Sequence, residues 1–146
     1  MLSLLQEELK KTLKAQDKAA VLAFRNIIGK LKARQIDKGT KLDDKECIQI
    51  LQSSIKQLKE SIRQYTNGGR NDLAESEKFE LKLMEKYLPK QLSENEIKLL
   101  VQEKIKSTGA TSIKDMGSIM GKLMNTFAGS VDGKLVKRIV EQELSL

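Results

Sequence analysis

The sequence predicts an all-α protein, and three observations support this. Apolar residues recur every three or four residues along most of the chain, which is the period of an amphipathic helix. Proline occurs once, aromatic residues make up only 3% of the chain, and Lys, Glu, Leu and Ile are common, a composition that favours helix over sheet. No segment alternates apolar and polar residues between hairpin turns. We expect a two-part helical protein, with an N-terminal bundle of long helices at 1–88 and a small three-helix unit at 91–146.

The first two helices are expected before Gly39. Leucines at helical spacing predict a short helix that ends near Gln16. Asp17 can accept hydrogen bonds from the first turn of the next helix and so cap it. The stripe that this second helix should bury consists of Ala20, Phe24, Ile27, Ile28 and Leu31.

The third and fourth helices are expected to form a long antiparallel pair. Asp43 and Glu46 have the spacing of a capping box, and a helical apolar pattern follows as far as Tyr65. The segment 67–69, Asn-Gly-Gly, should stop this helix because it tolerates positive φ. The fourth helix should begin at Asn71 or Asp72 and end at Pro89. Cys47 is the only cysteine, and its position in the apolar stripe predicts packing rather than reactivity.

The last third of the chain should hold three shorter helices. Gly109 is expected to close the fifth helix, and Ile113, Met116, Met120, Leu123 and Met124 should line one face of the sixth. Side chains suited to capping the three helix starts are Ser93 with Glu96, Ser112 with Asp115, and Asp132.

Two glycines lie within the predicted sixth helix. Gly117 and Gly121 are four residues apart, and a glycine in a helix interior costs roughly 1 kcal/mol relative to alanine. Such a pair predicts a close approach to the helix backbone, either by a neighbouring helix or by a ligand. Packing by the fifth or seventh helix is the favoured interpretation of the glycines. For the neighbouring Lys122, a solvated side chain and a contact to a ligand are equally good interpretations.

The net charge of +7 favours a polyanionic partner, with RNA or DNA ahead of an acidic membrane. Residues 1–90 carry 19 Lys and Arg against 13 Asp and Glu, whereas residues 91–146 carry 8 against 7. Most of the excess therefore lies in the first part. A basic, well-solvated surface without a dedicated partner explains the charge equally well.

Catalytic chemistry finds little support in the sequence. Histidine is absent, which removes the commonest acid–base group near neutral pH and most zinc and triad arrangements. Residues 117–123, Gly-Ser-Ile-Met-Gly-Lys-Leu, have the wrong spacing for a phosphate-binding P-loop and lack its Ser or Thr. We expect no catalytic residue, no metal and no cofactor. The N-terminus has no continuous apolar signal region and no segment is long enough to span a bilayer, so a cytoplasmic protein without a membrane partner is expected.

Several sequence blocks, in order along nearly the whole chain, resemble the YqeY family. They are Gly-Gly-Arg-Asn-Asp-Leu-Ala at 68–74, Tyr-Leu-Pro-Lys-Gln-Leu-Ser at 87–93, Gly-Ala-Thr-Ser at 109–112, the glycine-bearing block 115–124 and Asp-Gly-Lys-Leu-Val at 132–136. The resemblance implies a C-terminal part similar to the tail domain of the B subunit of the tRNA-dependent Asp/Glu amidotransferase. In that enzyme the tail belongs to the tRNA-recognition apparatus, apart from the kinase and glutaminase sites. The family's carbon–nitrogen ligase label, with glutamine as amido donor, would then apply only within a complex.

The first hypothesis is accordingly a non-catalytic tRNA-binding or amidotransferase-related accessory protein. Its partners would be tRNA and an aminoacyl-tRNA synthetase or amidotransferase, with no specificity for DNA. Exposed helix N-termini, open backbone and cations suit recognition of RNA shape. The candidate RNA-binding residues are Lys114, Gly117, Gly121, Lys122, Gly133, Lys134, Lys137 and Arg138.

The alternative is a helical adaptor that binds an acidic protein. Its basic rim on the third and fourth helices would comprise Lys56, Lys59, Arg63 and Arg70, and the second helix adds Arg25, Lys30, Lys32 and Arg34. Salt-sensitive binding to a protein, with indifference to RNA, would favour this alternative. A carbon–nitrogen ligase acting within a complex is the third hypothesis.

Overall fold

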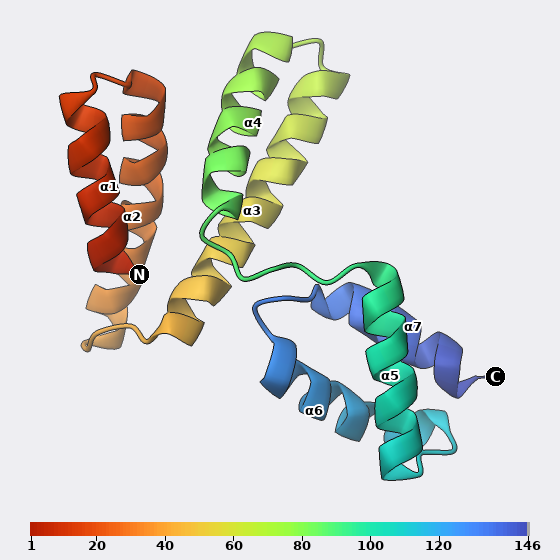
Figure 1. Ribbon diagram of the computed structural model, residues 1–146. Coiled ribbons are helices and arrows are strands. Elements are labelled where there is room, and N and C mark those ends of the chain that lie inside the picture. Colours follow the sequence, from red (N-terminus) through yellow and green to blue (C-terminus); the bar gives the residue numbers. More distant parts are fainter. Residues whose placement is uncertain (146) are drawn as a thin grey trace. The chain divides into compact units, whose positions relative to one another are not determined.

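The computed structural model describes residues 1–145, and within them it contains helices and no strand, which confirms the all-α prediction (Figure 1). The helices are α1 (Leu2–Lys14), α2 (Lys18–Lys38), α3 (Asp44–Asn67), α4 (Asn71–Glu85), α5 (Glu94–Thr108), α6 (Met116–Phe127) and α7 (Gly133–Leu144), with a short 3-10 helix, η1 (Ile113–Asp115), before α6. Their contacts divide the chain into unit 1, Met1–Leu88, and unit 2, from Pro89 onward. The domain limits expected from the sequence, 1–88 and 91–146, stay a prediction.

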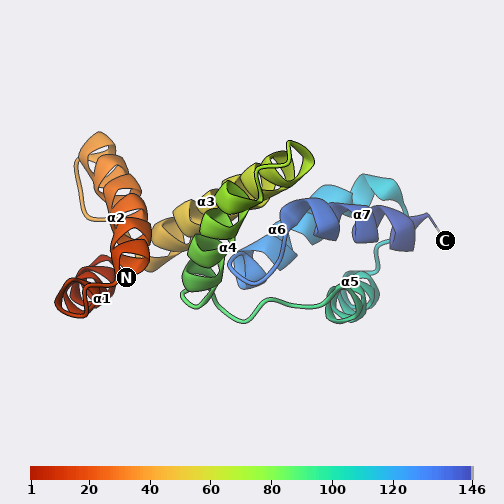
Figure 2. The same cartoon turned by 90° about the horizontal axis from the view of Figure 1, so that it is seen from above.

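Unit 1 consists of two helical hairpins around one apolar core. α1 lies beside α2, and α3 lies beside α4, in both views of the chain (Figures 1 and 2). The five residues of the expected α2 stripe are all buried, and they pack with Leu5, Leu51 and Met84. Phe24 meets Tyr87 edge-to-face, with ring centroids 6.0 Å apart. Cys47 is buried in the same cluster, as expected, and desolvation raises the pKa of its thiol.

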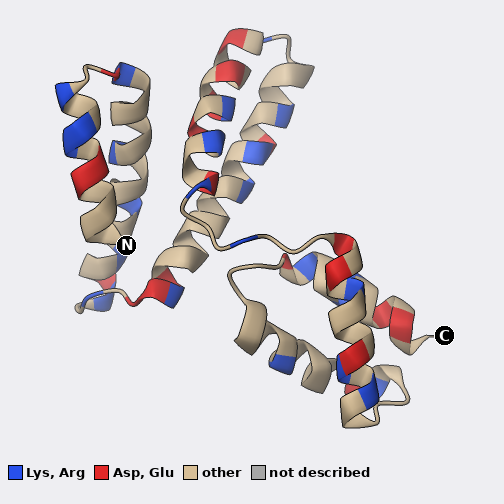
Figure 3. Cartoon of the chain, in the orientation of Figure 1, with Lys and Arg blue, Asp and Glu red and all other residues tan. Residues whose placement is uncertain are grey.

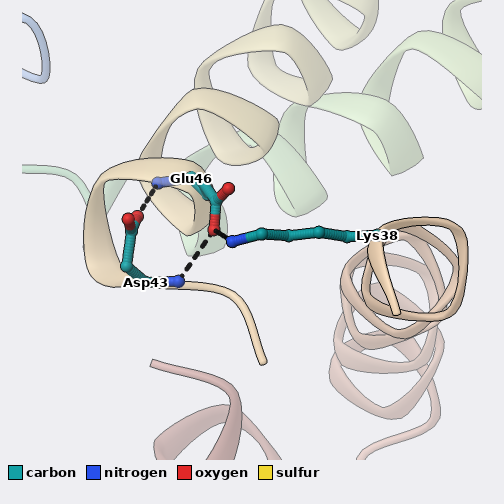
Figure 4. Close-up of polar contacts among 3 residues, drawn as sticks. All are labelled: Lys38, Asp43 and Glu46. Atoms are coloured by element: carbon teal, nitrogen blue, oxygen red, sulfur yellow. Dashed lines mark hydrogen bonds and ion pairs between the residues drawn. The ribbon is translucent and has the colours of Figure 1, made fainter. Parts of the chain in front are cut away.

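The predicted caps of α2 and α3 are formed. The Asp17 carboxylate accepts from the Ala20 backbone N–H at 3.1 Å. At the start of α3, Glu46 N–H donates to Asp43 Oδ1 at 2.8 Å while Asp43 N–H donates to Glu46 Oε2 at 2.9 Å (Figure 4). Lys38, from the last turn of α2, adds an ion pair to Glu46 at 2.7 Å. The hydrogen bonds from Lys38 and from the Asp43 backbone lower the pKa of the Glu46 carboxyl.

α4 ends earlier than Pro89 alone would require. Its last residue is Glu85, because Tyr87 N–H donates to Met84 O at 3.1 Å and Leu88 N–H to Glu85 O at 3.3 Å. These i→i−3 bonds replace the α-helical pattern before the proline is reached. The helix thus ends before Pro89, as predicted, and its last residue, Glu85, is the one whose carbonyl the proline ring would meet in a continued helix.

Unit 2 packs α5, α6 and α7 around a second core, which includes Ile97, Val101, Ile119, Leu123 and Val140. Ser93 and Glu96 form the expected capping box at α5, and Gly109 ends α5 in the left-handed region with φ of +68°. The segment before α5 is held to the loop before α7 by Leu92 N–H, which donates to Ser130 O at 2.8 Å.

The expected start and buried face of the sixth helix need correction. The chain first forms η1, and the Asp115 carboxylate accepts from the backbone N–H groups of Thr111 at 3.1 Å and Ser112 at 3.3 Å. Ile113 lies in this 3-10 turn and is 50% exposed, so it does not join the apolar face of α6. Ile119 is fully buried at the centre of that face instead.

Candidate nucleic-acid interface

Gly117 and Gly121 lie on the exposed side of α6, with open space around them. A Cβ atom built on either glycine would meet no atom within 4 Å, apart from the helix's own backbone. The interpretation of these glycines as a close helix–helix contact is therefore wrong for the described residues. Ile119 and Leu123 are buried in the core of unit 2. The glycines lie on the opposite side of α6, where no side chain covers the helix backbone.

The exposed side of α6 is polar, small and free of carboxylates. Ser118 and Asn125 are exposed on the same side as the glycines, Lys122 is exposed at the far edge of that side, about 100° around the axis from Gly121, and the helix contains no Asp or Glu. The only charged residue of α6 is therefore a cation, and in Figure 3 the ribbon of this helix carries blue but no red. Among residues 1–145, no carboxylate forms an ion pair with Lys122. Ser118 and Asn125 were not identified from the sequence, although Ser118 lies three residues before Gly121 and Asn125 four residues after it, spacings that share one helix face.

The N-terminus of α7 lies against the end of the α6 glycine row. Gly117, Gly121 and Met124 share one flank of α6, and Met124 Cε lies 3.7 Å from where a Cβ on Gly133 would be. The Asp132 carboxylate caps α7 as expected by accepting from Lys134 N–H at 3.0 Å. A carboxylate therefore already uses one of the free N–H groups at this helix end.

The three cations of α7 are exposed but differ in their surroundings. Lys137 follows Gly133 by four residues and so lies on the flank of α7 that faces Met124 of α6. Arg138 lies on the flank that faces α5, where its guanidinium donates to Glu94 Oε1 at 2.9 Å. Its charge is largely compensated there, so Arg138 contributes less to a positive surface than expected.

The structure does not gather all eight candidate residues into one patch. Gly133 lies against Met124 of α6, at the junction of α6 and α7, and Lys137 follows it by four residues on α7. Gly117 and Gly121 share the flank of Met124 but have no atom within 4 Å of a Cβ built on them, apart from the helix's own backbone. Lys122 is about 160° around the α6 axis from Met124, at 100° per residue, and hence on the flank away from that junction. Lys114 is exposed on η1, and Lys134 is exposed in the first turn of α7. Their assignment to RNA binding stays a prediction.

Two further features of the described residues concern metal binding and hollows in the surface. Residues 1–145 contain no cluster of three or more His, Cys, Asp or Glu side chains able to hold a metal ion. A hollow of about 520 Å³ between α5 and α7 is lined by exposed polar side chains and by part of Ile139. Ser93, at its edge, caps α5 by accepting from Glu96 N–H, so it is not arranged as a nucleophile.

The sequence matches a family model described as Yqey-like protein over residues 2–144. This chain belongs to the YqeY family. The YqeY chain is also similar to the yeast proteins named "Altered inheritance of mitochondria protein 41, mitochondrial". The protein of Vanderwaltozyma polyspora is 38% identical over 85 residues, which is 58% of this chain and 46% of that protein. Those of Kluyveromyces lactis and Saccharomyces cerevisiae are each 32% identical, over 84 and 87 residues.

The match covers about half the length of these relatives, at 45–47%. Their names correct one expectation from the sequence: they point to mitochondria, and the prediction of a cytoplasmic location is wrong. Within residues 1–145, no helix combines the length and the apolar character that crossing a membrane requires.

Proposed function

We propose that this YqeY-family chain is a non-catalytic tRNA-binding module that contacts RNA through unit 2. It would act alone or with an aminoacyl-tRNA synthetase or a tRNA-dependent amidotransferase. The single observation that carries the proposal is the uncovered backbone at Gly117 and Gly121 on a helix face with a cation and no carboxylate. The resemblance of the C-terminal part to the tail domain of the amidotransferase B subunit supplies the choice of tRNA.

An uncovered helix backbone suits the sugar–phosphate chain of folded RNA. Proteins recognise double-stranded RNA mainly by shape, through contacts to 2′-hydroxyl and phosphate groups. A ribose edge can approach a helix most closely where no Cβ projects, as at Gly117 and Gly121. Ser118 and Asn125 add hydroxyl and amide groups that can bond to a 2′-hydroxyl on the same face.

The surrounding cations would supply the electrostatic part of binding. Lys122 and Lys134 flank the face from α6 and from the start of α7, and Lys137 lies along the junction. Each lysine that neutralises a phosphate releases a counterion and so steepens the salt dependence of binding. Arg138 would contribute less, because it is paired with Glu94.

Catalysis would reside elsewhere. Any glutamine-dependent carbon–nitrogen ligase reaction would belong to a complex that the chain joins, in which the chain would help to present tRNA. This division fits the absence of histidine from the sequence.

Fluorescence anisotropy of labelled tRNA tests the proposal, with duplex DNA of similar length as the competing polymer. We expect saturable binding that prefers tRNA and survives near-physiological salt. Lys122→Glu with Lys134→Glu should weaken binding and flatten its salt slope, by about one unit for each phosphate that is no longer neutralised. The matched control is Lys10→Glu with Lys59→Glu, which makes the same change of charge on exposed residues of unit 1. If the two double variants weakened tRNA binding equally, with circular dichroism unchanged, binding would depend only on non-specific charge, and the proposed surface would be refuted.

A further inference from the structure

The helix α2 has apolar residues on two opposite sides. Its inner side is buried in unit 1 through Phe24, Ile27 and Leu31. On the outer side, Leu22 is 61% exposed and Ile36 is 79% exposed. An isolated exposed leucine or isoleucine is ordinary, but these two lie on one row of the helix, fourteen residues apart.

The exposed residues of this side follow a seven-residue repeat. Leu22, Gly29 and Ile36 form one row, with successive members seven residues apart. A second row with the same spacing runs beside it and consists of three cations, Lys18, Arg25 and Lys32. We call these six residues the outer stripe of α2: Lys18, Leu22, Arg25, Gly29, Lys32 and Ile36. A seven-residue repeat keeps both rows on one side over two turns per repeat, which is the spacing by which one helix contacts another.

The cations of the outer stripe have no partner in the part of the chain that the structure describes. No Asp or Glu of residues 1–145 forms an ion pair with Lys18, Arg25 or Lys32, although nearby cations are paired. Lys38 pairs with Glu46, whereas Arg63 and Arg70 of the α3–α4 rim pair with Glu60 and Asp72. Uncompensated positive charge therefore marks the outer stripe more than it marks the rim that the sequence indicated.

The outer stripe has space for a partner's side chains. A Cβ on Gly29, at its centre, would meet no atom within 4 Å apart from the helix's own backbone. At its N-terminal end, a hollow of about 460 Å³ lies between α1 and α2, lined by Leu13, Gln16, Val21 and three stripe residues, Lys18, Leu22 and Arg25. An apolar hollow with a cationic edge can accept a large apolar side chain of a partner protein, while a neighbouring carboxylate of that partner pairs with the cations.

We propose that the outer stripe of α2 docks an acidic amphipathic helix of a partner protein. Charge complementarity selects the acidic partner, and the seven-residue rows select a helix that places apolar residues on Leu22 and Ile36. An RNA backbone would use the cations but not the exposed apolar row. Insertion in a membrane calls for a broad apolar face, which two separated side chains do not provide. The proposal is independent of RNA binding, which concerns unit 2.

Two synthetic peptides test the proposal on the full chain. Each is a helix as long as α2 with leucine every seventh residue, and its flanking positions are all Glu in one peptide and all Lys in the other. Anisotropy should show that the natural chain prefers the Glu peptide. Lys18→Glu with Arg25→Glu and Lys32→Glu should lose about tenfold or more in affinity for the Glu peptide, if each surface pair contributes a few-fold. This triple variant should then prefer the Lys peptide. The matched control, Lys10→Glu with Lys45→Glu and Lys59→Glu, should keep the natural preference.

The apolar row has its own variants. Leu22→Asn with Ile36→Asn should weaken binding of the Glu peptide about tenfold, whereas Leu4→Asn with Phe79→Asn, at exposed sites outside the stripe, should not. Equal affinity for the two peptides, or a control variant that also reverses preference, would overturn the proposal. It would also be overturned if the stripe variants lost binding to tRNA or to phosphatidylglycerol vesicles while they kept their affinity for the Glu peptide.

Discussion

Replacement of the two α6 glycines by alanine tests the exposed face directly. Gly121 lies in the helix interior with negative φ and open space around it, so alanine should fit without strain. Glycine in such a position costs roughly 0.5–1 kcal/mol relative to alanine. Gly117 is the second residue of α6 and should gain less. We expect Gly117→Ala with Gly121→Ala to raise the free energy of unfolding by about 1 kcal/mol.

Urea denaturation followed by circular dichroism measures this change. If another helix packed on these glycines, the added methyl groups would instead overpack the contact and cost about 1–3 kcal/mol. The two interpretations therefore differ in sign, and a loss of stability would refute the open face. The same variant should bind tRNA more weakly, because each methyl group holds the sugar–phosphate chain away from the helix backbone.

Gly29→Ala is the matched control, because Gly29 is also helical, exposed and uncovered. It should stabilise unit 1 by a similar amount and leave tRNA affinity unchanged. A double α6 variant that is more stable yet binds tRNA as tightly as the natural chain would confirm that the face is open and refute its role in RNA binding.

Two further predictions concern stability. The pKa of Glu46 is lowered in the folded chain, so its contribution is present above the ordinary value of 4.5 and is lost as the pH falls through the folded value. In Glu46→Gln, the free energy of unfolding, measured by urea titration at several pH values, should therefore fall less on acidification than in the natural chain. An unchanged pH profile would contradict the role of the Lys38–Glu46–Asp43 contacts. In the core of unit 2, Ile119→Ala should cost about 2–5 kcal/mol because it leaves a cavity, whereas Ile113→Ala, at a half-exposed site, should cost much less. Similar losses of stability for both would contradict the observed register of α6.

The helix starts could be predicted because their determinants lie within a few residues of one another. Asp17, the Asp43–Glu46 box, the Ser93–Glu96 box and Asp132 each satisfy backbone N–H groups in the adjacent turn. The residues that form such a cap are neighbours in the chain whatever the rest of the fold does. The buried stripe of α2 could be predicted for the same reason, because a 3.6-residue period is local.

The register of α6 was predicted less well, since a 3-10 turn and an α-helix place the same side chains differently. Three residues per turn in η1 move Ile113 out of line with the later apolar residues. The Asp115 carboxylate, which bonds back to Thr111 and Ser112, stabilises this turn.

The sequence by itself determined the helical class, most helix ends and the presence of two unusual glycines on a helix. Only the tertiary structure decided what those glycines face, because that depends on where α5 and α7 pack. It also decided that Arg138 is paired with Glu94, a residue 44 positions away, while the cations of the outer stripe of α2 are not paired within residues 1–145. Caps and periodicity act over one or two turns, whereas exposure and charge pairing arise between segments distant in sequence and so follow only from the fold.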